Sequence, residues 1–207
     1  MTLVIAHQGA CWDAPGDMFE AFELAIEQGA DYVEFDVRAG TAGALVVSHD
    51  PVRSGRGRGQ TADVPTLDEV LENLSGRVGL AVEIKESAAT EGTLVALDRH
   101  GADPDGVLVL SFRFRALEAV RRARPDLRCV LHLGWRPDPT AATRFWGVGF
   151  RDPVATPRRL RAASALGLEA TVFTVNEPER MRSLADVGVT GIFTDRPGLL
   201  REVLARA

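Results

Sequence analysis

The sequence YVEFDV, residues 32–37, contains two acidic side chains inside an otherwise apolar run. Such a short run, rich in Val, Tyr and Phe, is typical of a buried β-strand, in which residues two apart lie on the same face. Glu34 and Asp36 therefore share one face, and the apolar residues around them share the other. Because an ionised side chain is costly to bury without a partner, this strand predicts a charged site inside the fold.

A second run, LAVEIK at residues 80–85, repeats the pattern. Glu83 and Lys85 lie on one face of this predicted strand, and its apolar residues lie on the other. If the polar faces of both strands meet in one cavity, they bring together three carboxylates and one ammonium, with a surplus of negative charge. A divalent cation that prefers oxygen ligands, Mg2+ or Ca2+, would balance that surplus. The structural alternative is a buried ion-pair network with Lys85 and Arg38.

Short apolar runs alternate along the chain with amphipathic stretches of helical spacing. Eight strands and about eight helices in this order predict an α/β fold, a (β/α)8 TIM barrel, for which about 200 residues is the usual minimum. A small hairpin is expected after the second strand, at residues 44–48. The alternative is a doubly wound open sheet, but no GxGxxG motif follows the first strand. The predicted barrel strands are residues 3–6, 32–37, 80–84, 107–110, 128–133, 147–150, 170–175 and 191–194.

Length and composition limit the other possibilities. At 207 residues and 45% hydrophobic, the chain can bury one full core, and without a linker-like stretch residues 1–207 predict a single domain. The net charge of -5 argues against nucleic-acid binding. Without a basic leader or an apolar run near the ~18 residues of a membrane span, we expect a cytoplasmic protein with no stable membrane insertion. Cys11 and Cys129 show no zinc motif, and no pattern indicates an oligomeric state.

Polar residues occur where the predicted strands end. Active sites of TIM barrels lie at the carboxyl ends of the strands, so these positions predict where the chemistry takes place. His49 and Asp50 follow the small hairpin and are expected on a loop over the mouth of the barrel. The polar residues at predicted strand ends are His7, Asp36, Lys85, Asn176 and Asp195.

A series of short motifs runs along the chain in a fixed order. The residues that carry it are His7, Gly9, Pro15, 29–31, Glu34, Asp36, Val37, His49 and Asp50, with later stretches at 65–71, 83–85, 111–112, 172–176 and 188–195. This order resembles the glycerophosphodiester phosphodiesterase family, whose pattern runs His-Arg-Gly, Pro-Glu-Asn-Thr, Gly-Ala-Asp, Glu-x-Asp-Val and His-Asp. The resemblance covers nearly the whole chain.

The resemblance implies an enzyme that cleaves a small phosphodiester to an alcohol and sn-glycerol 3-phosphate. It implies that Glu34, Asp36 and Glu83 bind a divalent metal ion, Mg2+ or Ca2+. It also implies that His7 and His49 act as general acid and base. Imidazole suits this task because its ordinary pKa is about 6.5.

Two motif positions differ from the family pattern. Gln8 stands where the family has Arg, and Pro-Gly-Asp-Met at residues 15–18 stands where the family has Pro-Glu-Asn-Thr. We expect Lys85 and Gln8 to bind the substrate phosphate. A hydrogen bond from a neutral amide contributes about 1 kcal/mol, against about 1.5–3 from a charged donor. Binding of the transition state should therefore be about tenfold weaker or more than with an arginine.

The expected substrate pocket includes Phe173, Asn176 and Arg53. Phe173 replaces a tryptophan that often occupies this position in the family. Arg53, Arg56 and Arg58 follow the His-Asp motif closely, and we hypothesise that one of them supplies the phosphate contact that Gln8 lacks.

Two other functions remain open. Gln8 favours a barrel that binds a phosphorylated ligand without cleaving it. The same residues could instead expel an alcohol by attack of a substrate hydroxyl, leaving a cyclic phosphate, as similar phospholipase D toxins do. His100 and His132 have no partners in the sequence and are interpreted as structural, and Asp17 as a helix cap.

Overall fold

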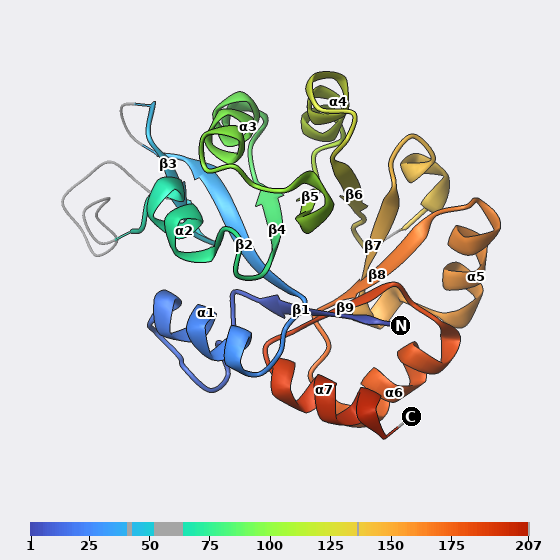
Figure 1. The fold of residues 1–207 in the computed structure, drawn as a ribbon. Helices are drawn as coiled ribbons and strands as arrows, with labels where there is room; N and C mark the ends of the chain where they lie inside the picture. The colour runs from blue at the N-terminus through green and yellow to red at the C-terminus, as the bar shows by residue number, and fades with distance from the viewer. Residues whose placement is uncertain (41–42, 52–63, 136, 207) are drawn as a thin grey trace.

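The computed structural model describes residues 1–40, 43–51, 64–135 and 137–206. Eight parallel strands form a barrel, which closes because β1 pairs with β9 on one side and with β2 on the other. The predicted (β/α)8 fold is confirmed (Figure 1). The barrel strands are β1 (Leu3–His7), β2 (Tyr32–Ala39), β4 (Gly79–Ile84), β5 (Val107–Ser111), β6 (Arg128–His132), β7 (Gly147–Arg151), β8 (Glu169–Phe173) and β9 (Gly191–Thr194).

Helices surround the barrel, as Figure 1 shows. Between β6 and β7, unlike the other connections, the described residues form only a 3-10 turn, Pro139–Ala142. Pro137 and Pro139 explain the difference, because proline lacks the N–H that a helix interior needs. The α-helices in the described part of the chain are α1 (Met18–Glu27), α2 (Leu67–Leu74), α3 (Thr90–Arg99), α4 (Phe114–Ala123), α5 (Pro157–Ala165), α6 (Pro178–Val187) and α7 (Pro197–Ala205).

Two local predictions at the ends of elements are confirmed. Strand β3 (Leu45–Val47) pairs antiparallel with β2 and forms the expected hairpin. The Asp17 side chain caps α1 by accepting a hydrogen bond from the Glu20 N–H, which satisfies a donor that the first helical turn leaves free.

The two faces of β2 lie in different environments. Val33, Phe35 and Val37 belong to the large core between the barrel and its helices. Tyr32, on the opposite face, belongs to a second, smaller apolar cluster. The residues of this cluster alternate along the barrel strands with those of the large core. Because Glu34 and Asp36 have the same parity as Tyr32, they point into the barrel, as the sequence predicts.

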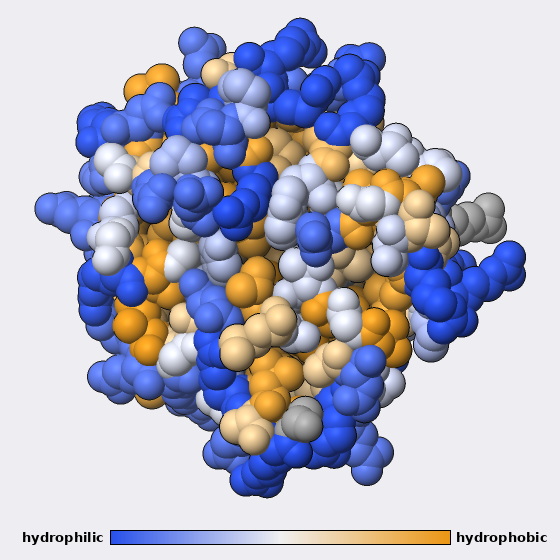
Figure 2. Space-filling model, turned by 45° about the vertical axis from the view of Figure 1, so that its right-hand side comes forward, coloured by the Kyte–Doolittle hydropathy of each residue, from blue (hydrophilic) through white to orange (hydrophobic). Residues whose placement is uncertain are grey.

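The surface shows mixed polarity. Figure 2 shows a face on which hydrophilic side chains form most of the outline, with hydrophobic ones gathered between them toward the middle. Within the described ranges, none of the helices has the length and apolar character needed to cross a membrane.

Candidate active site

The strand register brings the acidic residues together at the carboxyl ends of β1, β2 and β4. His7 is the register partner of Glu34, and Asp36 is the register partner of Glu83. All three carboxylates are buried, and ligand oxygens from each lie within 4.8 Å of one another. The convergence that the two strand patterns predicted is confirmed, and it concentrates negative charge in a small volume.

Lys85 neutralises part of this charge. Its Nζ lies 2.7 Å from Asp36 Oδ1 and 2.8 Å from Glu83 Oε1. Both contacts are ion pairs of buried carboxylates with a single ammonium, so the three acids outnumber the one lysine charge beside them. Arg38 pairs with Glu86 and not with the three carboxylates. Of the ion-pair network that the sequence offered as the structural alternative, only the part made by Lys85 forms.

The two acids beside Asp36 respond differently to their surroundings. Burial and the neighbouring Asp36 carboxylate raise the pKa of Glu34 to about 8. Burial also opposes ionisation of Glu83, but the His132 ring and the Lys85 ammonium outweigh it and lower its pKa to about 2. Glu34 therefore carries a proton at neutral pH unless another cation joins the cluster.

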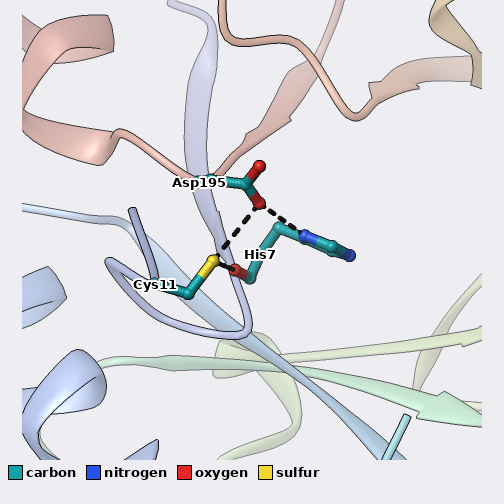
Figure 3. Close-up of side chains that lie close together, drawn as sticks. All are labelled: His7, Cys11 and Asp195. Atoms are coloured by element: carbon teal, nitrogen blue, oxygen red, sulfur yellow. Dashed lines mark hydrogen bonds and ion pairs between the residues drawn. The ribbon is translucent and has the colours of Figure 1, made fainter. Parts of the chain in front are cut away.

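His7 is held by Asp195, which directly follows β9. Its Nδ1 lies 2.7 Å from Asp195 Oδ1, and Asn176 Nδ2 donates to the other oxygen of that carboxylate at 2.6 Å. The Cys11 Sγ–H donates weakly to Asp195 Oδ1 at 3.4 Å. Figure 3 shows the second ring nitrogen of His7 pointing away from Asp195. Burial lowers the pKa of His7, but the hydrogen bond with the Asp195 carboxylate overcomes this and raises it to about 11.

These groups line a cavity of about 250 Å³. His49 lies at this cavity, although 62% of its side chain is exposed, and its Nδ1 is 3.1 Å from Asp50 Oδ1. Phe173 is in the lining as expected, whereas Asn176 acts through Asp195, and Arg53, Arg56 and Arg58 fall outside the described residues. The lining residues are His7, Glu34, Asp36, His49, Glu83, Lys85, Phe112, His132, Arg151, Phe173, Thr174 and Phe193.

Gln8 faces the acidic cluster from the β1 end. Its backbone N–H donates to Glu34 Oε2 at 3.2 Å, and its Nε2 lies 3.4 Å from Asp36 Oδ2. Gln8 has a positive φ of 52°, which only a few per cent of non-glycine residues adopt. Gly9 follows with φ 79°, and a Cβ there would lie 2.6 Å from the Ala21 backbone, so the motif glycine allows β1 to approach α1.

The sequence analysis missed His132 and Arg151. His132 was interpreted as structural, yet its buried ring lines the cavity with Nδ1 3.5 Å from Glu83 Oε2, and it stacks on Phe173 at 4.3 Å. Neither ring nitrogen has a hydrogen-bond partner within the described ranges. Both residues are the last of a strand, β6 and β7, which is the same signal that identified His7.

Gly149 on β7 makes room for the His132 ring. A Cβ at residue 149 would lie 2.3 Å from His132 Cδ2 and 3.2 Å from Phe173 Cε1. We therefore expect Gly149→Ala to destabilise the protein by about 1–3 kcal/mol through overpacking, as measured by urea unfolding. Gly134→Ala is the matched control, because no atom lies within 4 Å of a Cβ there. Equal stability of the two variants would contradict this packing.

The fold and the site define a class of protein: a (β/α)8-barrel enzyme with a buried carboxylate cluster and basic side chains at the carboxyl ends of its strands. The glycerophosphoryl diester phosphodiesterase family model matches residues 7–54 and 51–199. The chain belongs to this family, which confirms the resemblance seen in its motifs.

Individual relatives match nearly the whole of this chain in sequence or in structure. The probable glycerophosphodiester phosphodiesterase 2 of Mycobacterium tuberculosis is 32% identical, over 98% of this chain and 90% of the relative. A glycerophosphodiester phosphodiesterase structure from Parabacteroides distasonis has a TM-score of 0.86 at 25% identity, covering 99% and 97% of the two chains. An Oleispira antarctica phosphodiesterase, solved with the product sn-glycerol-3-phosphate, shares the fold with a TM-score of 0.87 at 22% identity, covering 99% and 97%.

Proposed function

We propose that this chain hydrolyses glycerophosphodiesters to sn-glycerol 3-phosphate and an alcohol. Family membership and the relative from M. tuberculosis support this reaction class. The observation that carries the proposal is the buried cluster of Glu34, Asp36 and Glu83, which shares one cavity with His7 and His49. The cavity, of about 250 Å³, combines these polar groups with the aromatic side chains of Phe112 and Phe173.

The three carboxylates fit a hard divalent cation. They supply only oxygen donors, they are buried, and ligand oxygens from all three lie within 4.8 Å of one another. We infer that Glu34, Asp36 and Glu83 bind Mg2+ or Ca2+, both of which prefer such ligands. When bound, such an ion would polarise the phosphodiester and stabilise negative charge on its oxygens. Lys85 adds a second positive charge for the same oxygens.

The two histidines divide the proton transfers in this proposal. His7 keeps its proton because of its high pKa, so we assign it as the general acid that protonates the departing alcohol oxygen. His49, exposed at the cavity, takes the proton from the attacking water. One P–O bond forms to the water oxygen and one breaks to the alcohol, so each turnover consumes one water molecule.

Turnover of glycerophosphodiesters by the metal-loaded protein tests this function directly. The assay should follow free alcohol and sn-glycerol 3-phosphate over several head groups, with phosphorus NMR of the product. If the product is a cyclic phosphate instead of sn-glycerol 3-phosphate, the alcohol is expelled by internal attack of a substrate hydroxyl, and not by hydrolysis.

A barrel that binds without cleaving remains the second candidate, because Gln8 supplies a neutral amide beside Asp36. Metal binding without turnover in the wild type and in Gln8→Arg would support it. Turnover in either protein would reject it.

Metal binding should depend strongly on pH. Because Glu34 is protonated below its pKa of about 8, the metal must displace that proton, and affinity should rise about tenfold per pH unit from pH 6 to 8. About one proton should be released per ion bound at pH 6.5. Calorimetry of Mg2+ or Ca2+ binding in buffers of different ionisation enthalpy measures this release. Affinity that stays constant from pH 6 to 9 would contradict the protonated state of Glu34.

We further propose that residues 1–207 work as one domain, because the first and last barrel strands pair with each other. A cytoplasmic location and the absence of nucleic-acid binding stay predictions from the sequence.

A further inference from the structure

Arg151, the last residue of β7, lines the cavity together with the acidic cluster. Its guanidinium carbon lies 5.3 Å from the ring centre of Phe112, 5.2 Å from that of Trp135 and 5.8 Å from that of Phe173. We call these three rings the aromatic box. Aromatic faces hold a guanidinium in place through cation–π attraction, yet they do not neutralise its charge.

Arg151 differs from the other basic groups of the cavity in having no acidic partner. Within the described ranges no carboxylate oxygen lies within 4.0 Å of its guanidinium, and its buried Nε has no hydrogen-bond partner there. A guanidinium stays charged at any physiological pH and presents donors in a planar fork that suits carboxylate or phosphate. The basic residues of the cavity that do have a carboxylate within 4.0 Å are His7, His49, Lys85 and His132.

Arg151 does not touch the acidic cluster: its guanidinium lies against the aromatic box, and no described carboxylate oxygen lies within 4.0 Å of it. Contacts lead from Glu83 to His132 at 3.5 Å, from His132 to Phe173 by stacking, and from Phe173 to Arg151. Lys85, in contrast, touches the cluster itself. Arg151 therefore suits a substituent of the substrate that extends away from the phosphorus atom.

We propose that Arg151 and the aromatic box form a head-group subsite that selects phosphodiesters whose alcohol carries an anionic oxygen group, such as a carboxylate. This inference rests on the proposed function and narrows its substrate class. An empty aromatic box would attract a quaternary ammonium, but here a guanidinium already lies against its faces and repels a second cation.

Two substrates that differ by one carboxylate test this subsite. Glycerophosphoserine and glycerophosphoethanolamine share the phosphodiester and the amine, and only the first has a carboxylate. We expect kcat/KM for the serine compound to exceed that for the ethanolamine compound at least about tenfold in the wild type, since a charge-assisted hydrogen bond contributes about 1.5–3 kcal/mol. In Arg151→Gln the ratio should fall to about 1, and Arg151→Lys should keep part of it.

Arg144→Gln is the matched control, because this exposed arginine pairs with Glu118 on the outside of the barrel. Its substrate ratio should equal that of the wild type. A wild-type ratio near 1, or a ratio that Arg151→Gln leaves unchanged, would overturn the subsite. Thermal unfolding of each variant shows whether it is folded, so a folded variant with an unchanged ratio is decisive.

A binding measurement separates failure of the subsite from failure of the proposed function. If the wild type turns over neither substrate, the proposed hydrolysis fails, and calorimetry then compares O-phosphoserine with phosphoethanolamine on the metal-loaded protein. Tighter binding of O-phosphoserine, by about tenfold in the wild type and lost in Arg151→Gln, would still support the subsite. Equal binding of the two ligands would overturn it.

Discussion

His7→Gln is expected to lower kcat for glycerophosphodiesters by about 10²–10⁴-fold, with little change in KM. The glutamine amide can still donate to Asp195, so the neighbouring network of Asn176 and Asp195 should persist. What the variant loses is an ionised N–H that points away from Asp195 and that, in the proposed mechanism, protonates the leaving alcohol (Figure 3).

The leaving group distinguishes acid catalysis from mere positioning. A p-nitrophenolate leaving group departs from a phosphodiester without needing a proton. His7→Gln should therefore slow cleavage of a p-nitrophenyl diester much less than cleavage of an alkyl diester. An equal loss on both substrates would show that His7 acts by position alone. His100→Gln is the matched control, because His100 lies at the C-terminal end of α3 and contacts Asp68. The kcat of this variant should equal that of the wild type.

Glu34→Gln is expected to weaken metal binding and to lower kcat/KM, each by at least about 100-fold. Loss of an outer partner of a metal ligand already reduces affinity or activity by about 10–100-fold, and Glu34 is proposed to be a direct ligand. The amide has nearly the shape of the protonated acid and can still accept the hydrogen bond from the Gln8 N–H. The variant should therefore fold normally.

Stability without metal gives an independent reading of the same variant. The folded-state pKa of Glu34, about 8, exceeds its ordinary value of 4.5, so the folded wild type binds more protons than the unfolded chain between these values. Its stability should fall as pH rises from about 4.5 to 8, while Glu34→Gln lacks this loss. At pH 8.5 the variant should be more stable by at least about 1 kcal/mol, and at pH 4.5 the two should be similar.

Urea unfolding at both pH values with a chelator present measures this difference. Glu91→Gln, which changes an exposed carboxylate in the first turn of α3, is the control and should follow the wild type at each pH. A Glu34→Gln protein that is less stable than the wild type at pH 8.5 would contradict a protonated Glu34. Tight Mg2+ and Ca2+ binding by that variant would contradict the metal site.

Much of the fold was predictable because its signals are local. The alternation of YVEFDV places Glu34 and Asp36 on one face whatever the strand pairs with, since successive side chains of any strand point to opposite sides. The regular order of apolar and amphipathic segments indicated the barrel, and Asp17 marked the start of α1. The 3-10 turn that the described residues form between β6 and β7 was also encoded locally, in Pro137 and Pro139.

Other features depend on which strands become neighbours. Asp195 bonds to His7 across 188 residues of sequence, and nothing near either residue specifies that contact. His132 and Arg151 belong to the cavity only because closure of the barrel turns every strand end toward one axis. Side-chain parity follows from the geometry of the backbone within a few residues, and the sequence alone therefore reveals it. Register and closure depend on the packing of distant strands, so the partners of His7 and the aromatic surroundings of Arg151 emerge only in the folded barrel.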